Sequence, residues 1–259
     1  MELGIKNKKV LITGSSRGLG SKLAKDFSKE ECKIILVGRN KVNLIKTFNE
    51  IGGKDNGNSY YVMDLLQSGS PKKLSKHILE KNMGVDIIIH NLGGALGVRD
   101  PLAQYNDWKK VWDFNVGVSI QLNNLLIPKM IKNNWGRIVH ISSVNAISAG
   151  EVNTKYGASH AYNSSKSYLN TYVKSISREL IKKNIVISSV MPGPIMSKGK
   201  HWEKLKKQKL NIYKEFINNF IPSGKLSTYD EISPFVLLLS SDKSTLASGS
   251  SLKIDGSQV

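Results

Sequence analysis

Tyr162 and Lys166 lie four residues apart in the segment Ala161-Tyr-Asn-Ser-Ser-Lys166. In a helix this spacing places a phenol and an ammonium group on one face, one turn apart. Such a pair can do proton chemistry, because the phenol can release a proton and a nearby cation favours the phenolate. Taken alone, the same residues would also fit a buried tyrosine beside a lysine on a helix surface.

A glycine-rich turn near the N-terminus could hold a dinucleotide that reacts together with this pair. The stretch Thr13-Gly-Ser-Ser-Arg-Gly-Leu-Gly20 follows a short apolar segment at residues 10–13. Gly14, Gly18 and Gly20 have no Cβ atoms to obstruct a pyrophosphate, and a following helix would point its positive N-terminus at the phosphates. A glycine cluster alone often marks only a tight strand-to-helix turn. The turn and the Tyr–Lys pair in one chain together suggest a reductase.

The end of the next apolar segment bears on the choice of nicotinamide cofactor. Folds that prefer NAD usually place Asp or Glu there, where it accepts hydrogen bonds from ribose hydroxyls. Here the segment ends Leu36-Val-Gly-Arg-Asn40, without an acid. Arg39, helped by Arg17, could pair with a 2′-phosphate through charge-assisted hydrogen bonds. This predicts NADP(H) over NAD, although Arg39 alone would also fit a solvated loop.

Strand and helix signals alternate along the whole chain. Apolar strands are expected at residues 10–13, 33–37, 59–63, 85–89, 137–142, 185–190 and 251–254, and helices at 18–27, 42–51, 74–80, 108–130, 161–183 and 229–239. Continuously apolar strands separated by helices indicate a parallel sheet covered on both faces. We therefore predict an α/β fold of the Rossmann type, a doubly wound seven-stranded parallel sheet in one domain over residues 1–259. A Lys-rich insertion at about residues 196–222 is expected to be helical.

Composition sets further bounds. A length of 259 residues suits one large α/β domain, which can bury enough surface to fold without disulfides or a metal. The single Cys32 can form no internal disulfide and is expected to fill the core in a reducing compartment. No apolar run approaches the length of a membrane span, and the N-terminus has no apolar signal core. We expect a cytoplasmic protein that does not contact membranes.

The formal net charge of +18 is the one unusual compositional feature. Of the 38 basic residues 33 are lysines, and they are scattered, whereas nucleic-acid readers tend to cluster charge and to favour arginine. A nucleic-acid partner is therefore disfavoured. Seven lysines and His201 do crowd into residues 198–214. They could attract an anionic substrate or an acidic carrier, or they could cover the exposed face of an amphipathic helix.

Several motifs in a fixed order carry a family resemblance. They are the glycine turn, Asn91-Leu-Gly-Gly94, Asn115, Ser143, Tyr162-Asn-Ser-Ser-Lys166 and Pro192-Gly193. This set resembles the short-chain dehydrogenase/reductase family, in its single-domain branch, and is most similar to the 3-oxoacyl-carrier-protein reductase type. The resemblance runs from Lys8 to Gly256.

The resemblance implies four catalytic groups. Tyr162 would be the general acid, Lys166 would lower the pKa of Tyr162 and hold the nicotinamide ribose, Ser143 would bind the substrate oxygen, and Asn115 would anchor a water that relays protons. Tyr156 is a weaker alternative acid because His160, and not lysine, follows four residues later. Strand alternation lets only one of Ser142 and Ser143 face the site, and the family pattern favours Ser143.

The resemblance also implies cofactor contacts and an assembly. The cofactor residues would be Gly14, Ser16, Arg17, Gly18, Leu19, Gly20, Arg39, Asp64, Leu65, Asn91, Gly93, Tyr162, Lys166, Pro192, Gly193, Ile195 and Ser197. Of these, Asp64 would bond the adenine amino group. No metal is implied. The family's two long helices commonly pair in dimers or tetramers, so a homo-oligomer is expected.

Two departures from the family pattern stand out. Leu92 replaces a residue that is usually small, and the interval from Ser143 to Tyr162 is longer than usual. The extra segment carries Glu151, Asn153, Lys155, Tyr156 and His160, and its polarity favours a sugar or a sugar nucleotide over a simple acyl chain.

Three functions follow in order of preference. The first is NADPH-dependent interconversion of a carbonyl and a secondary alcohol on a small-molecule substrate, with an acyl-carrier thioester among the candidates. The second is a cofactor-sensing regulatory protein without chemistry, disfavoured because Tyr162 and Lys166 are both present. The third is a nucleic-acid-binding protein, disfavoured by the scattered lysines.

Overall fold

The structure is a computed structural model that describes residues 1–148, 156 and 159–259. Its centre is a seven-stranded sheet in the order β3-β2-β1-β4-β5-β6-β7, and every neighbouring pair is parallel. The strands are β1 (Lys9–Thr13), β2 (Lys33–Gly38), β3 (Ser59–Val62), β4 (Ile87–His90), β5 (Gly136–Ile141), β6 (Ile185–Pro192) and β7 (Ser251–Ile254). The order reverses between β1 and β4, and in open parallel sheets ligands bind outside the carboxyl ends of the strands at such a reversal.

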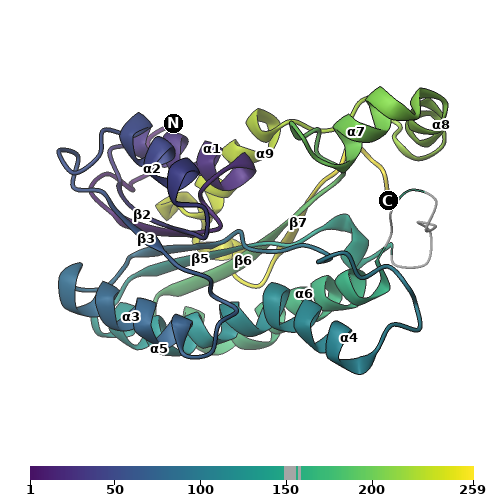
Figure 1. Ribbon diagram of the computed structural model, residues 1–259. Coiled ribbons are helices and arrows are strands. Elements are labelled where there is room, and N and C mark those ends of the chain that lie inside the picture. The colour runs from purple at the N-terminus through teal and green to yellow at the C-terminus, as the bar shows by residue number, and fades with distance from the viewer. Residues whose placement is uncertain (149–155, 157–158) are drawn as a thin grey trace.

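Helices cover both faces of the sheet (Figure 1). One face carries α1 (Gly18–Lys29), α2 (Lys41–Glu50) and α9 (Tyr229–Leu239), and the other carries α3 (Ser70–Lys81), α4 (Tyr105–Trp112), α5 (Val118–Lys132) and α6 (His160–Ile181). Successive side chains of β1 point to opposite faces, so Val10 and Ile12 join one apolar cluster and Leu11 joins the other. Burial on both faces explains why the strands are continuously apolar, and the predicted fold class is confirmed.

The single helix predicted over residues 108–130 is wrong. A π-helical turn at Asp113–Gly117 separates α4 from α5. The side-chain nitrogen of Asn115 donates to the carbonyl oxygens of Val111 (2.8 Å) and Gly94 (2.9 Å). Val111 is the residue whose carbonyl would accept the Asn115 backbone N–H in an α-helix. This competition fits the local widening, and π-turns of this kind are frequent at functional sites.

Most elements begin or end within one or two residues of the expected bounds, and α3 and β4 also differ. Helix α3 begins at Ser70, four residues early, because Pro71 in its first turn is tolerated where the backbone N–H groups have no helical partner. Strand β4 begins at Ile87 and extends to His90, where the prediction was residues 85–89.

The Lys-rich region after β6 forms two helices, α7 (His201–Gln208) and α8 (Leu210–Phe220), which lie apart from the main helical layers (Figure 1). Phe216 and Ile217 of α8 are buried in a small apolar cluster with Tyr156, Ile221 and Leu226. No helix in the described part of the chain is long and apolar enough to cross a membrane.

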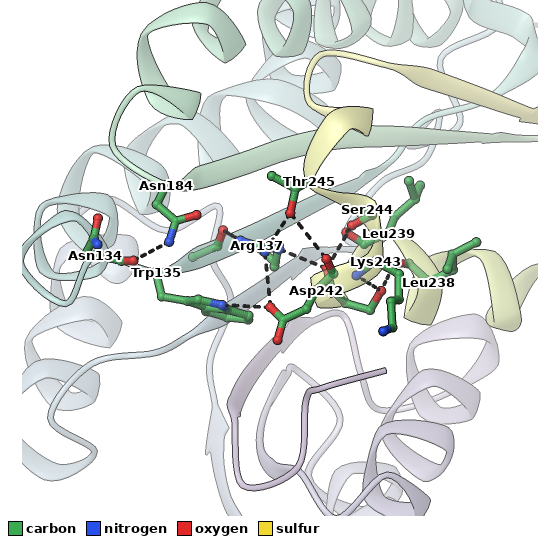
Figure 2. Close-up of polar contacts among 12 residues, drawn as sticks. Asn134, Trp135, Arg137, Asn184, Leu238, Leu239, Asp242, Lys243, Ser244 and Thr245 are labelled. Atoms are coloured by element: carbon green, nitrogen blue, oxygen red, sulfur yellow. Dashed lines mark hydrogen bonds and ion pairs between the residues drawn. The ribbon is translucent and has the colours of Figure 1, made fainter. Parts of the chain in front are cut away.

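A buried arginine ties β5 to the segment that follows α9 (Figure 2). Arg137, with 2% of its side chain exposed, donates from Nε to the carbonyl oxygen of Ser241 (3.1 Å), and its Nη2 lies 3.3 Å from Oδ1 of Asp242. Trp135 donates to the same carboxylate oxygen at 3.0 Å, and the guanidinium lies 4.5 Å from the Trp135 ring centroid. These contacts lie at the beginning of β5, so they stabilise the edge opposite the carboxyl ends of the strands.

Candidate active site

The glycine turn joins β1 to α1 and is held against the end of β4. The side-chain nitrogen of Asn91 donates to the carbonyl oxygens of Thr13 (3.1 Å) and Gly14 (3.2 Å). A Cβ at Gly20 would lie 2.5 Å from the Gly14 oxygen and 2.6 Å from the Asn91 side-chain nitrogen, so only glycine fits. The first turn of α1 carries no acidic residue, so its N–H groups and positive dipole end are available to an anion.

A cavity of about 500 Å³ opens beside this turn. Its lining includes nine residues predicted to bind the cofactor: Gly14, Ser16, Arg17, Gly18, Arg39, Asp64, Leu65, Asn91 and Gly93. Leu19 and Gly20 are buried behind it. The volume is within the usual range of cofactor sites, and the helix N-terminus and the basic side chains suit a phosphorylated ligand. The chain therefore fits a dinucleotide at this place.

Arg39 and Asp64 meet at the rim of this first cavity. Nη1 of Arg39 lies 3.5 Å from Oδ2 of Asp64, and 60% of the Arg39 side chain is exposed. An exposed pair at this distance is weak. Oδ1 of Asp64 accepts from the backbone N–H of Leu66 at 3.0 Å, which holds the carboxylate near the end of β3. Arg39 therefore keeps charge that can be offered to a phosphate.

A second cavity, of about 390 Å³, contains the predicted catalytic hydroxyls. Ser143 and Tyr162 line it, together with Gly193 and Ile195. Of the other residues predicted near the nicotinamide, Pro192 ends β6, and Ser197 donates from its hydroxyl to the Ile195 carbonyl oxygen at 3.4 Å. Neither of these two is among the residues lining either cavity.

The structure distinguishes the hydroxyls of Ser142 and Ser143 by their hydrogen-bond partners. Ser142 is buried, and its hydroxyl lies 3.5 Å from the backbone oxygen of Lys166. The Ser143 oxygen accepts from the backbone N–H of Asn145 at 3.2 Å, which leaves its O–H free to donate. Ser143 is therefore the serine whose proton can reach a substrate oxygen or the Tyr162 oxygen.

Lys166, Asn115 and Gly93 meet beneath these cavities. Lys166 is 2% exposed and donates from Nζ to the carbonyl oxygen of Ile141 at 2.7 Å. Oδ1 of Asn115 accepts from the backbone N–H of Gly94 at 2.9 Å. A Cβ at Gly93 would lie 2.8 Å from that oxygen and 3.0 Å from Nζ of Lys166, so this close packing needs glycine. The side chain of Asn115 is thus occupied in fixing the loop after β4.

The pKa values of the Tyr–Lys pair shift in directions set by burial. Burial lowers the pKa of Lys166 to about 7. Burial raises the pKa of Tyr162, and its hydrogen bond with Ser143 opposes that rise. Lys166 is not among the causes of this shift, and the expected lowering of the Tyr162 pKa by Lys166 together with an oxidised nicotinamide stays a prediction. Nζ lies 5.6 Å from the tyrosine ring centroid, and an amine of pKa about 7 is only partly charged at neutral pH.

The polar loop expected beside the substrate falls largely outside the described residues. Glu151, Asn153 and Lys155 belong to that part, and of them nothing is described. Tyr156 is described and is buried against Phe216 and Phe220, with its hydroxyl donating to Glu215 at 2.8 Å. That hydroxyl is thus engaged by α8, which disfavours Tyr156 as the acid.

Sequence reasoning missed part of both linings. In the first cavity these residues are Val37, Gly38, Asn40, Met63 and Phe114, with Leu92 noted only as a departure from the family pattern. In the second they include Ala95, Arg99, Asn145, Ser159, Trp202, Phe216 and Gln258. Lys200 and His201 were expected only as members of the cluster at residues 198–214 that could attract an anion. Arg99 follows β4 and was open to detection, because loops at the carboxyl ends of parallel strands carry sites.

The parallel sheet, the glycine turn and the Tyr–Lys pair, with Lys166 buried, are the features of an oxidoreductase with a dinucleotide site. A model of the short chain dehydrogenase family matches residues 8–208, and the chain belongs to that family. Among similar proteins are 3-oxoacyl-[acyl-carrier-protein] reductases of Aquifex aeolicus (30% identical over 99% of both chains) and of Buchnera aphidicola subsp. Schizaphis graminum (31% identical over 97% of both). The crystal structure of L-sorbose reductase from Gluconobacter frateurii, complexed with NADPH and L-sorbose, superposes with a TM-score of 0.88 at 25% identity, covering 100% of this chain and 98% of that one.

Proposed function

We propose that the protein interconverts a carbonyl and a secondary alcohol by hydride transfer with NADP(H), using Tyr162 as the general acid and base. The observation that carries this proposal is the placement of Tyr162 and Ser143 in one cavity, with Lys166 buried on the same helix one turn beyond Tyr162. The adjacent cavity beside the glycine turn suits the dinucleotide. A bound nicotinamide supplies the hydride for reduction and accepts it in the reverse direction.

In the direction of reduction, Tyr162 gives its phenolic proton to the carbonyl oxygen. The raised pKa keeps that phenol protonated before the reaction. The Ser143 O–H, which is hydrogen-bonded to Tyr162, can donate to the same oxygen and stabilise the charge that develops on it. Lys166, with a pKa of about 7, can hold or release a proton near neutral pH and so can return one to Tyr162. Asn115 positions the loop of Gly93 and Gly94 against Lys166.

Replacing Tyr162 by Phe tests the chemistry. Tyr162→Phe should lower kcat at least 1000-fold, in the range of general acid catalysis, while the Kd for NADPH changes less than threefold. Nicotinamide fluorescence measures binding, and NADPH absorbance measures turnover of a reactive ketone. A variant that keeps its turnover would contradict the role of Tyr162. A native protein that binds NADPH without turning over any carbonyl or alcohol would favour the cofactor-sensing alternative.

NADP(H) preference is proposed from Arg17 and Arg39, which line the first cavity. L-sorbose reductase was solved with NADPH, which is consistent with that preference. Arg39→Leu should weaken NADPH binding about tenfold or more and leave NADH binding nearly unchanged, because only NADPH has a 2′-phosphate. Equal losses for both nucleotides would contradict this assignment.

A polar ketone is proposed as substrate because of the lining of the second cavity. Asn145 and Gln258 offer hydrogen bonds, and none of the lining residues in the described part is a carboxylate. Arg99 and His201 lie on the same cavity, so a negative group on the substrate would be tolerated there. A panel of ketoses, ketose phosphates and 3-oxoacyl thioesters with NADPH tests this. Faster turnover of the thioesters would point to the activity named for the acyl-carrier relatives.

A homo-oligomer is proposed from the outer surfaces of α5 and α6. Leu125 and Tyr168 on these helices are 36% and 47% exposed. Light scattering coupled to size exclusion should give at least twice the chain mass of 28.7 kDa. A single-chain mass at micromolar concentration would contradict the proposal.

A further inference from the structure

The start of α7 lies between the two cavities. Lys200, the residue before α7, lines the first cavity with Arg17 and Gly18. The next two residues, His201 and Trp202, line the second cavity with Ser143 and Tyr162. Three consecutive residues of the Lys-rich insertion therefore face two adjacent cavities.

Lys200 shares the first cavity with Arg17 and Arg39 and forms no ion pair within the described residues. Burial, and then the charges of Arg17 and Lys204, lower the pKa of Lys200. Within residues 1–148, 156 and 159–259, neither Lys200 nor Arg17 forms an ion pair with a carboxylate. Holding like charges close together is unfavourable unless an anion binds between them. The only acidic residue in the cavity lining, Asp64, lies against Arg39.

The other lysines of α7 are placed differently. Lys207 pairs with Glu203 of its own helix at 3.2 Å, and Nζ of Lys206 lies 5.7 Å from the Tyr213 ring centroid. Lys204 is exposed and lines neither of the two cavities. The lysines of α7 are therefore mostly exposed to solvent. Lys200, directly before α7, is the lysine that lines the dinucleotide cavity.

Hydrogen bonds and ring stacking hold the backbone of Lys200 and the side chains of the two residues that follow it. Its N–H donates to the Ser197 carbonyl oxygen at 3.1 Å, and its carbonyl oxygen accepts from the Lys204 N–H at 3.0 Å. His201 Nε2 lies 3.0 Å from the Tyr156 carbonyl oxygen, and the Trp202 ring stacks on Phe216 with centroids 4.3 Å apart. Lys200 is therefore continuous in the backbone with two residues that are held against the aromatic wall of the second cavity.

We propose that Lys200 binds a phosphate group of the dinucleotide together with Arg17, and that this contact positions His201 and Trp202 for the substrate. The inference rests on the proposed function, since the ligand is the nicotinamide dinucleotide. It adds a cofactor contact from the insertion that links occupancy of the first cavity to the shape of the second. The same contact would favour cofactor binding before substrate.

Binding of two nucleotides to matched variants tests the contact. Lys200→Met removes the charge and keeps the length of the side chain, and Lys204→Met makes the same change at an exposed position one turn later. The Kd values for NADPH and NADH are measured by nicotinamide fluorescence at 50 and 300 mM NaCl. Lys200→Met should weaken NADPH binding about tenfold at low salt and less at high salt, with Lys200→Arg close to wild type and Lys204→Met within twofold.

The NADH arm identifies the phosphate. An equal loss for both nucleotides assigns Lys200 to the pyrophosphate, and a loss confined to NADPH assigns it to the 2′-phosphate. Lys200→Met and Lys204→Met values within twofold of each other, for both nucleotides, overturn the contact while the proposed function stands. A wild-type chain that binds neither nucleotide overturns both proposals.

Hydrogen exchange tests the link between the cavities without relying on turnover. NADPH at saturating concentration should slow exchange of the amides of residues 201–208 in the wild-type and Lys204→Met proteins. In Lys200→Met, also saturated, that protection should be lost. Equal protection in all three proteins would overturn the link.

Discussion

Replacing Lys166 by Met should make the protein more stable at neutral pH. The folded chain buries the Lys166 ammonium, which lowers its pKa from 10.5 to about 7. The unfolded chain therefore binds more protons than the folded chain between about pH 7 and pH 10.5. The free energy of unfolding therefore rises with pH across this window, because the buried Lys166 is neutral in the folded chain. Below about pH 7 both states carry the proton, and the folded state bears the full cost of a buried cation.

The structure gives the size of this effect. The difference between 10.5 and about 7 corresponds to roughly 5 kcal/mol at about 1.4 kcal/mol per pH unit. At pH 7, where the group is half protonated, the cost is roughly 4 kcal/mol. Methionine removes this cost but loses the hydrogen bond to Ile141, worth about 1 kcal/mol. Lys166→Met should thus gain about 3 kcal/mol at pH 7, and this gain should shrink by about 1.4 kcal/mol per pH unit above that.

Urea unfolding at pH 7.5 and pH 9.5 measures the effect. The difference between Lys166→Met and wild type isolates residue 166, because all other titrating groups are present in both proteins. That difference should fall by about 3 kcal/mol between the two pH values. Lys174→Met, at an exposed position of the same helix, should differ from wild type equally at both pH values. A pH-independent gain for Lys166→Met, or a wild type that is the more stable protein at pH 7.5, would refute the reasoning.

Two further substitutions test other parts of the structure. Arg137→Met should lower the free energy of unfolding by about 2 kcal/mol, because it leaves the Ser241 carbonyl without its buried donor and removes one of two donors to the half-exposed Asp242 carboxylate. Urea unfolding would measure it, and a loss below 1 kcal/mol would contradict a stabilising role for this cluster. Gly93→Ala should lower kcat about 10- to 100-fold with unchanged circular dichroism, because its Cβ would displace the Asn115 oxygen or the Lys166 ammonium. Wild-type kcat in this variant would show that the contact is not needed.

The fold could be predicted from the sequence because the signals for it are local. Burial on both faces gives strands such as β1 and β2 continuous apolar runs, and the helices between the strands are long enough to show their period. The glycine turn could also be recognised in the sequence, because the Gly14 backbone and the Asn91 side chain lie too close to Gly20 for any other residue. These features depend on neighbours in the chain or on the sheet itself.

The π-turn at Asp113–Gly117 could not be predicted, because its cause lies in another loop. Asn115 has a low helix propensity, but one asparagine in an apolar run is ordinary. The Asn115 side chain that competes for the Val111 carbonyl is held in place by two hydrogen bonds with Gly94, 21 positions away. Only the folded chain brings those two positions together, so periodicity read along residues 108–130 gave an uninterrupted helix.

The position of Lys200 could not be predicted from the sequence either. In the sequence it is one of seven lysines between residues 198 and 214, and composition cannot distinguish among them. In the fold, α7 begins at the residue after Lys200, and Lys200 lines the dinucleotide cavity. Lys204 and Lys207, one and two turns later, face solvent. Each residue of an α-helix advances by about 100°, so a shift of the α7 register by two residues would turn the His201 and Trp202 side chains by about 200°, away from the second cavity. The position at which a short helix begins thus determines which of several identical charges can act on a ligand, and aligning the chain to a distant relative does not reveal that position.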